Sequence, residues 1–184
     1  MTFEAETTVS LGSPASAFSL PDVVTGKNVS LQDLSPSKAL LIIFLCRHCP
    51  HVIHVRKALL DLVRQYQPAG LACISICSND AIKYPDDAPD KLREMAIECK
   101  FPFPLLYDES QAVARAYGAR CTPDFFLYDA QHRLAYRGRF DDSTPGNGKP
   151  VTGNDLRAAM EQLLAGKPVS LDQKPGMGCS IKWK

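Results

Sequence analysis

The chain has 184 residues, with 21 Lys and Arg against 20 Asp and Glu, which gives a formal net charge of +1. A chain of this length favours one domain, here residues 1–184, with enough buried surface to cover both faces of a sheet. Because the charge is balanced and no run of one sign occurs, we expect neither nucleic acid nor an anionic membrane as a partner.

The first six residues are acidic and polar, and they lack the basic and apolar regions of a signal peptide. No apolar run approaches the roughly 20 residues that span a bilayer. Seven cysteines at irregular spacings do not fit a disulfide framework, so the better interpretation is one redox pair among buried thiols in a reducing compartment. The sequence therefore predicts a cytoplasmic protein without contact to a membrane.

The N-terminal part of the chain predicts an extension ahead of the main sheet. Residues 1–16 have the pattern of an irregular or edge-strand lead-in. Two short segments, residues 18–20 and 28–31, flank Thr-Gly-Lys at 25–27 and predict a β-hairpin. Ser-Pro-Ser at 35–37 then interrupts the chain before the next apolar run.

A strand and a helix are predicted on either side of a Cys-Arg-His-Cys sequence. The apolar run over residues 39–45, with β-branched residues in its middle, predicts a parallel strand buried on both faces. Residues 51–66 place apolar side chains at spacings of three and four, which predicts a helix, and Pro50 suits its first turn. We expect Cys46 at or near the helix N-cap and Cys49 one turn into the helix, so that the two thiols meet.

The position of these cysteines has a chemical consequence. A helix N-terminus carries roughly +0.5 of a charge and free N–H donors, which favour a thiolate over a thiol. Arg47 adds a permanent positive charge and His48 a conditional one, so both are predicted to lower a cysteine pKa. Cys46, the outer residue, is the expected nucleophile, and Cys49 is the expected resolving thiol. Stabilising the reduced form in this way predicts a more oxidising disulfide than a Gly-Pro spacer would give.

The middle of the chain continues the alternation of strands and helices. Residues 71–77 predict a second buried strand, in which Cys73 and Cys77 are small packing residues. A helical stripe ends at Cys99, which we expect to pack against the core. Shorter elements follow, namely a strand over 105–107, a helix over 110–117, and an antiparallel strand pair over 125–128 and 134–138.

A Cys-x-x-Cys between a strand and a helix, with Thr122 and Pro123 directly before a later strand, resembles the thioredoxin superfamily. The resemblance implies a cis bond before Pro123 and a proline that faces the two cysteines. It also implies that Thr122 presents its backbone to an extended substrate strand. Cys121, two residues before the proline, is then either a third redox thiol or an inert buried neighbour.

The C-terminal tail, residues 167–184, follows a last helical stripe and has no periodicity of its own. Its cysteine, Cys179, allows two interpretations. It could resolve a disulfide with either motif cysteine, which requires Cα atoms within about 7 Å. Alternatively, the tail folds back and packs through Ile181 and Trp183.

The layout of residues 9–165 and the ending over 178–184 resemble the peroxiredoxin-like subgroup related to the AhpC/TSA family. The resemblance implies a thioredoxin-like α/β fold in which helices flank both faces of a central mixed β-sheet, with an N-terminal β-hairpin extension and an irregular C-terminal tail. It equates Cys49 with the peroxidatic cysteine. The sequence departs from that family where Cys46 replaces a threonine and where Pro123 takes the place of the peroxidatic arginine. Relatives often form dimers, and no feature of this sequence demands one.

These features predict a thiol–disulfide oxidoreductase that uses Cys46 and Cys49 on a protein or small-molecule disulfide. Thr122 and Pro123 would hold the substrate, and an external reductant or oxidant would recycle the pair. One alternative is a peroxiredoxin-like, antioxidant thiol peroxidase in which Cys49 or Cys46 reacts with peroxide. Another is a non-enzymatic redox sensor or metal-binding module.

Histidines beside the two cysteines raise the question of a metal site. Thiolates and imidazoles together suit zinc or copper. His51 and His54 are three residues apart on one helix face, however, and His48 precedes the helix, whereas structural zinc takes ligands from two separated segments. We therefore predict no metal site, and the resemblance implies no cofactor.

Overall fold

The computed structural model describes residues 2–4 and 9–184, and its main feature is a five-stranded mixed sheet with the strand order β6-β5-β4-β8-β9. Strands β4, β5 and β6 run parallel, while β8 is antiparallel to β4 and β9 is antiparallel to β8. These strands are β4 (Ala39–Phe44), β5 (Leu71–Cys77), β6 (Leu105–Tyr107), β8 (Asp124–Asp129) and β9 (Leu134–Gly138).

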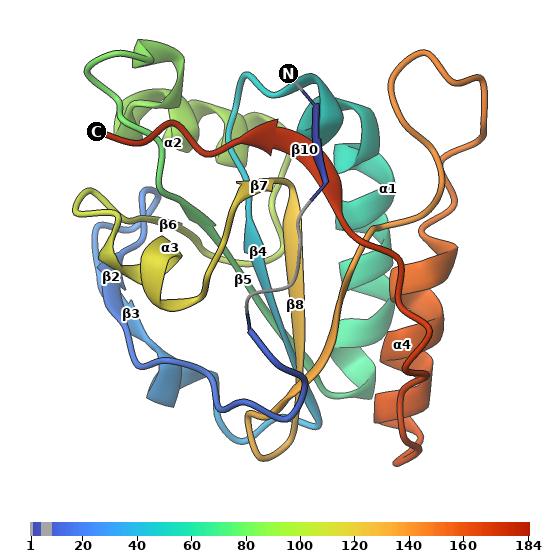
Figure 1. The fold of residues 1–184 in the computed structure, drawn as a ribbon. Helices are drawn as coiled ribbons and strands as arrows, with labels where there is room; N and C mark the ends of the chain where they lie inside the picture. Colours follow the sequence, from blue (N-terminus) through green and yellow to red (C-terminus); the bar gives the residue numbers. More distant parts are fainter. Residues whose placement is uncertain (1, 5–8) are drawn as a thin grey trace.

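Both faces of this sheet are covered, which is why all six residues of its central strand β4 are buried. Leu41 and Ile43 point to the face that packs against three helices, and Leu40 and Ile42 point to a second cluster that includes Tyr117 and residues of the N-terminal hairpin. The first face carries α1 (Pro50–Tyr66), α2 (Pro89–Glu98) and α4 (Asn154–Leu164), and the second carries α3 (Ala112–Ala116) (Figure 1). The predicted α/β class with helices on both faces is confirmed.

The N-terminal hairpin is also confirmed, with β2 (Ser19–Pro21) antiparallel to β3 (Asn28–Ser30). The expected lead-in over residues 1–16 is described only in part, because residues 1 and 5–8 lie outside the described residues. Within it, Thr2–Glu4 form the strand β1. Single-turn 3-10 helices occur at Leu31–Leu34, Gln67–Ala69 and Pro85–Asp87.

The C-terminal tail is not irregular throughout, and this expectation was wrong. Met177–Ser180 form β10, which is antiparallel to β1 on one side and to β7 (Cys121–Thr122) on the other. The result is a second, three-stranded sheet of order β1-β10-β7. The tail does fold back as the packing interpretation required, since Ile181 is buried and Trp183 packs at the edge of the second core cluster.

Three of the remaining cysteines pack as expected. Cys73 and Cys77 are buried in β5, and burial raises the pKa of both thiols, so neither is ionised at neutral pH. Cys99 is half-buried at the end of α2 and packs against the first core cluster. Among the described residues, no helix combines the length and the apolar character that crossing a membrane would require.

Candidate active site

The two motif cysteines lie where the buried strand β4 ends and α1 begins. The strand ends at Phe44, and Pro50 is the first residue of the helix, where its missing N–H is not needed for a helical hydrogen bond. The N-cap is Cys49, and Cys46 precedes it by three residues in the connecting loop. The expectation that Cys46 would cap the helix and Cys49 would lie one turn inside was therefore wrong by one turn, because the helix starts at the proline and not earlier.

Both sulfurs contact the same residue on the opposite side of the site. Cys46 Sγ lies 3.4 Å from Thr122 Oγ1, and Cys49 Sγ lies 3.0 Å from the carbonyl oxygen of Thr122, to which the Cys49 thiol donates a hydrogen bond when it is protonated. The Thr122–Pro123 bond is cis, as the sequence predicts. Strand β7 therefore lies beside the loop that follows β4. Thr122 brings the four candidate residues together, namely Cys46, Cys49, Thr122 and Pro123.

The two sulfurs differ in how their surroundings shift their pKa values. Hydrogen bonding from the Cys46 thiol lowers the pKa of Cys49 to about 4, with further help from Cys179, Thr122 and the N–H of Val52 in the first turn of α1.

The Cys46 thiol is held in its protonated form. The hydrogen bond with Cys49 raises the pKa of Cys46, and burial and the nearby carboxylate of Asp87 raise it further. These pKa directions favour ionisation of Cys49 over Cys46, and the expectation from the sequence that Cys46 is the nucleophile stays a prediction.

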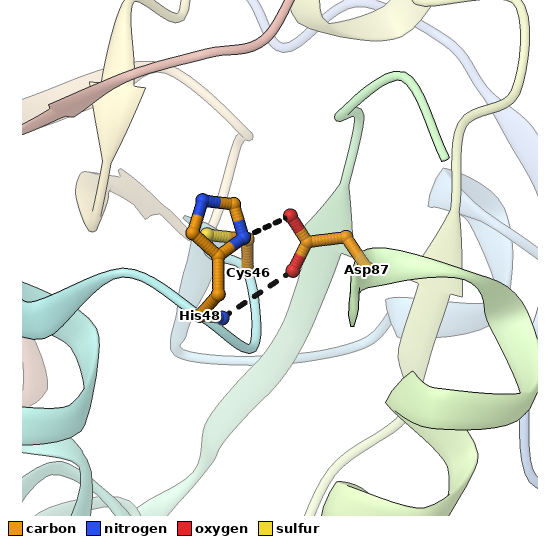
Figure 2. Close-up of side chains that lie close together, drawn as sticks. All are labelled: Cys46, His48 and Asp87. Carbon is orange, nitrogen blue, oxygen red and sulfur yellow. Dashed lines mark hydrogen bonds and ion pairs between the residues drawn. The ribbon is translucent and has the colours of Figure 1, made fainter. Parts of the chain in front are cut away.

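Arg47 and His48 contact acidic groups and not the sulfurs. The backbone N–H of Arg47 donates a hydrogen bond of 2.8 Å to Asp87 Oδ1. The backbone N–H of His48 donates to the same oxygen at 3.4 Å, and His48 Nδ1 lies 2.6 Å from Asp87 Oδ2 (Figure 2). The Arg47 guanidinium lies 3.8 Å from the exposed Asp86. Neither basic residue is among the main influences on the two thiol pKa values, so their predicted pKa-tuning role has no support in this geometry.

Asp87 is a site residue that the sequence analysis missed. Its side chain is fully buried beside Cys46, and it accepts a hydrogen bond of 2.7 Å from Asn79 Nδ2 in addition to those from the motif loop. The side-chain oxygen of the same residue, Asn79 Oδ1, accepts a hydrogen bond from the backbone N–H of Lys182 in the tail. A buried carboxylate thus ties the cysteine loop, through one asparagine, to the C-terminal segment. The sequence offered only a Pro/Asp-rich loop as a signal.

The two further thiols near the site differ in their surroundings. Cys121 is buried, its Sγ faces the carbonyl oxygen of Pro123 at 3.6 Å, and burial raises its pKa. Cys179 is partly exposed and stands opposite Thr122 in the register of β10 with β7. Burial, followed by a hydrogen bond with Cys49, raises the pKa of Cys179 to about 11. Of the two, Cys179 packs against the core cluster that contains Cys46 and Cys49.

One group of potential metal ligands exists among the described residues, formed by Cys46, His48 and Asp87, whose donor atoms lie within 4.8 Å of one another. The 2.6 Å between His48 Nδ1 and Asp87 Oδ2 is a hydrogen-bond distance. Two ligands at about 2.0–2.1 Å from one zinc ion stand roughly 3.3 Å apart in a tetrahedron. This group would have to widen before it could hold an ion.

The two histidines of α1, His51 and His54, are not part of the group formed by Cys46, His48 and Asp87. His54 Nε2 is 2.7 Å from Ser143 Oγ, and His51 and His54 line a small hollow together with Pro123 and Met177. This hollow borders the proline that faces the dithiol. None of the residues that line it is a cysteine.

Comparisons with known proteins agree with this geometry. The model of the AhpC/TSA family matches residues 11–137. An uncharacterized conserved protein from Geobacillus kaustophilus is 47% identical, with a TM-score of 0.97, and the match covers 100% of this chain and 97% of that one. No curated protein matches.

More distant structures share the fold alone. Peroxidoxin BcpB from Mycobacterium tuberculosis is 19% identical with a TM-score of 0.62, over 84% of this chain and 96% of that one. The thioredoxin domain of a thiol-disulfide oxidoreductase from Bacteroides vulgatus is 18% identical with a TM-score of 0.60, over 71% of this chain and 89% of that one.

Proposed function

Because the chain belongs to the AhpC/TSA family of thioredoxin-fold proteins, we propose that it is a thiol–disulfide oxidoreductase in which Cys46 and Cys49 exchange two electrons with a disulfide substrate. The observation that carries the proposal is the contact of both sulfurs with Thr122, at 3.4 Å and 3.0 Å, beside the cis proline. Two thiols that lie this near to one residue, beside a short strand that can pair with an extended chain, suit an exchange between sulfurs.

The reaction begins at Cys49 in this proposal. Its thiolate attacks one sulfur of the substrate disulfide, a mixed disulfide forms, and the other substrate sulfur leaves as a thiolate. Cys46 then gives up its proton to that thiolate and attacks Cys49 Sγ. The second substrate sulfur leaves, takes up a proton, and the Cys46–Cys49 disulfide remains. The substrate is reduced by two electrons, and an external dithiol must return them to the protein.

The irregular cysteine spacing supports a reducing compartment as the place of action, and we therefore keep the cytoplasm as part of the proposal. The same compartment would supply a dithiol reductant. The substrate class is a disulfide in a protein segment or a small thiol compound that fits beside Thr122.

Insulin reduction in the presence of dithiothreitol tests the proposal. The wild-type chain should accelerate precipitation of the insulin B chain, and Cys49→Ser should abolish the acceleration. Cys99→Ser is the matched control, because that thiol lies at the end of α2, outside the site. No acceleration over dithiothreitol alone would reject the oxidoreductase.

Single-cysteine variants assign the roles of the two sulfurs. If Cys49 attacks, Cys46→Ser should accumulate a mixed disulfide with the substrate through Cys49. Trypsin cleaves after Arg47, between the two cysteines, so mass spectrometry can tell which sulfur is linked. A stable mixed disulfide through Cys46 in Cys49→Ser, and none through Cys49, would restore the order expected from the sequence.

A second candidate, a thiol peroxidase, is favoured by the lowered pKa of Cys49 and by the donors that face it. Cys49 would attack a peroxide and become a sulfenic acid while an alcohol or water leaves. Cys46 would then displace water to form the same disulfide. Pro123 stands where the family has its peroxide-polarising arginine, which argues for the disulfide as the better substrate. Consumption of hydrogen peroxide no faster than by a free thiol would reject this candidate.

A further inference from the structure

The C-terminal strand occupies the edge that the proposed function assigns to a substrate. Strand β10 pairs with β7 so that Cys179 stands opposite Thr122 and Ser180 opposite Cys121. Figure 1 shows β10 crossing the end of the molecule beside β7 and the start of α1. A substrate strand that added to β7 at Thr122 would need the same hydrogen-bonding groups.

The segment that follows β10 is anchored by named contacts. The N–H of Ile181 donates to the carbonyl oxygen of Arg120 at 3.0 Å, and the carbonyl oxygen of Lys182 accepts from Gln111 Nε2 at 2.9 Å. The guanidinium of Arg115 stacks over the Trp183 ring at 4.4 Å. These contacts hold the tail against α3 and the segments on either side of it in the chain, so its register against β7 is set by more than two strand pairs.

Gly178 lets the tail strand approach Thr122 more closely than any other residue could. A Cβ at Gly178 would lie 2.2 Å from the carbonyl oxygen of Thr122 and 2.6 Å from its carbonyl carbon, which is backbone and cannot yield. The same carbonyl oxygen accepts the hydrogen bond of Cys49. The glycine therefore brings the next residue, Cys179, to the side of Thr122 on which Cys49 lies, and Cys179 packs against the core cluster that contains Cys49.

We propose that Cys179 is a third redox thiol of the site and that the tail is an internal substrate, which forms a disulfide with Cys49. The proposal rests on the dithiol chemistry of Cys46 and Cys49 given above. Three observations carry it: the strand pairing that sets Cys179 opposite Thr122, the glycine that allows close approach, and the 3.0 Å between Cys49 Sγ and the carbonyl oxygen of Thr122.

The step conserves electrons and protons. Once a substrate has oxidised the pair, the Cys179 thiolate attacks Cys49 Sγ, the Cys49–Cys179 bond forms and the Cys46–Cys49 bond breaks. Cys46 leaves as a thiolate and takes up the proton that Cys179 lost. The disulfide has moved from the motif to the tail without any new oxidant. In the same way, Cys179 can release a substrate from a mixed disulfide on Cys49.

Glutathione provides the test because it forms a mixed disulfide with a defined mass. Oxidised glutathione is added to the full-length Cys46→Ser variant, free thiols are alkylated, and disulfide-linked tryptic peptides are identified by mass spectrometry. We expect the Cys49–Cys179 link and little glutathione on Cys49, because Cys179 displaces it. In Cys46→Ser/Cys179→Ser the glutathione should stay on Cys49. Cys46→Ser/Cys99→Ser is the matched control and should behave like Cys46→Ser alone.

The dependence on docking is tested with two glycines. Gly178→Ala, introduced into Cys46→Ser, should slow formation of the Cys49–Cys179 link about tenfold or more, because the tail is then only tethered and no longer held in register. Gly176→Ala should leave the rate unchanged, since its Cβ would lie 3.5 Å from the nearest atom, Gly138 O.

Two results would overturn the proposal in different ways. If glutathione persists on Cys49 equally with and without Cys179, the internal-substrate role is refuted while the oxidoreductase stands on its insulin activity. If Cys49 accepts no glutathione in any variant, Cys49 is not the exchanging sulfur, and both the tail proposal and the mechanism above fail.

Discussion

The substitution Gly178→Ala should open the active site to solvent. In the native fold Cys46 is 1% and Cys49 is 0% exposed, and β10 lies directly over the residue that both sulfurs contact. The added methyl group would stand 2.2 Å from Thr122 O, well inside van der Waals contact, so β10 must separate from β7.

The size of the effect follows from what the separation breaks. Two residue pairs between β10 and β7 are lost, and net hydrogen-bond contributions of about 1 kcal/mol each give about 2 kcal/mol against the docked tail. A free-energy change of 2 kcal/mol corresponds to about a 30-fold change in an equilibrium constant. If the thiols react only when the tail is undocked, their alkylation rate should rise by about the same factor.

Residue-resolved alkylation by iodoacetamide measures this directly, because trypsin cleavage after Arg47 separates the peptides of Cys46 and Cys49. The control is Gly176→Ala, whose Cβ would make only an ordinary contact at 3.5 Å. Neither glycine has a positive φ, so an alanine causes no backbone strain at either position, and the two variants differ only in the contact of the added methyl group. Equal alkylation rates in Gly178→Ala, Gly176→Ala and wild type would refute the idea that the tail controls access.

Three other predictions concern charge. Asp87→Asn should lower the pKa of Cys46, because it removes a carboxylate that raises this pKa. Thiolate absorbance at 240 nm, measured in the Cys49→Ser background, should report the shift. An unchanged titration would contradict the assigned influence of Asp87. In the wild-type protein this absorbance should persist from pH 8 down towards about 4, since the pKa of Cys49 is lowered to about 4. It should vanish in Cys49→Ser. If it is lost only in Cys46→Ser, the thiolate belongs to Cys46. Arg137→Leu should lower the free energy of unfolding by about 3–5 kcal/mol, because it leaves the buried Asp124, which lies 3.0 Å from the guanidinium, without its partner. Urea denaturation measures this loss. A loss below about 1 kcal/mol would show that this ion pair does not stabilise the fold.

The elements that could be predicted from the sequence are those with a strong local pattern. The run of apolar residues that became β4 and the helical stripe of α1 carry their own periodicity, and the motif between them needs only their order in the chain. The cis bond at Pro123 followed from the resemblance, because Thr122 and Pro123 directly precede a strand. Element boundaries were less secure, and one turn of error at the start of α1 moved Cys49 from inside the helix to its N-cap and Cys46 from the N-cap into the preceding loop.

The elements that escaped prediction depend on contacts distant in sequence. Strand β10 is four residues long and contains a glycine, so no alternation marks it, and its partner β7 lies more than 50 residues earlier. Asp87 sits in a loop whose composition suggested solvent, yet the fold buries it against the start of the motif. Both reach the active site only after the sheet has formed, and no local pattern carries that information.

These two missed features act on the same reaction from opposite sides. In the proposed mechanism the Asp87 carboxylate adds to the hydrogen bond with Cys49 and to burial in raising the pKa of Cys46, so that Cys49 carries the negative charge. The tail sets Cys179 opposite Thr122, which both sulfurs contact, and both sulfurs are buried. Because an external disulfide must displace β10 before it can reach Cys49, its rate of reaction scales with the fraction of molecules whose tail is undocked. Cys179 needs no such opening, so the balance between internal and external exchange is set by how firmly the tail binds to β7.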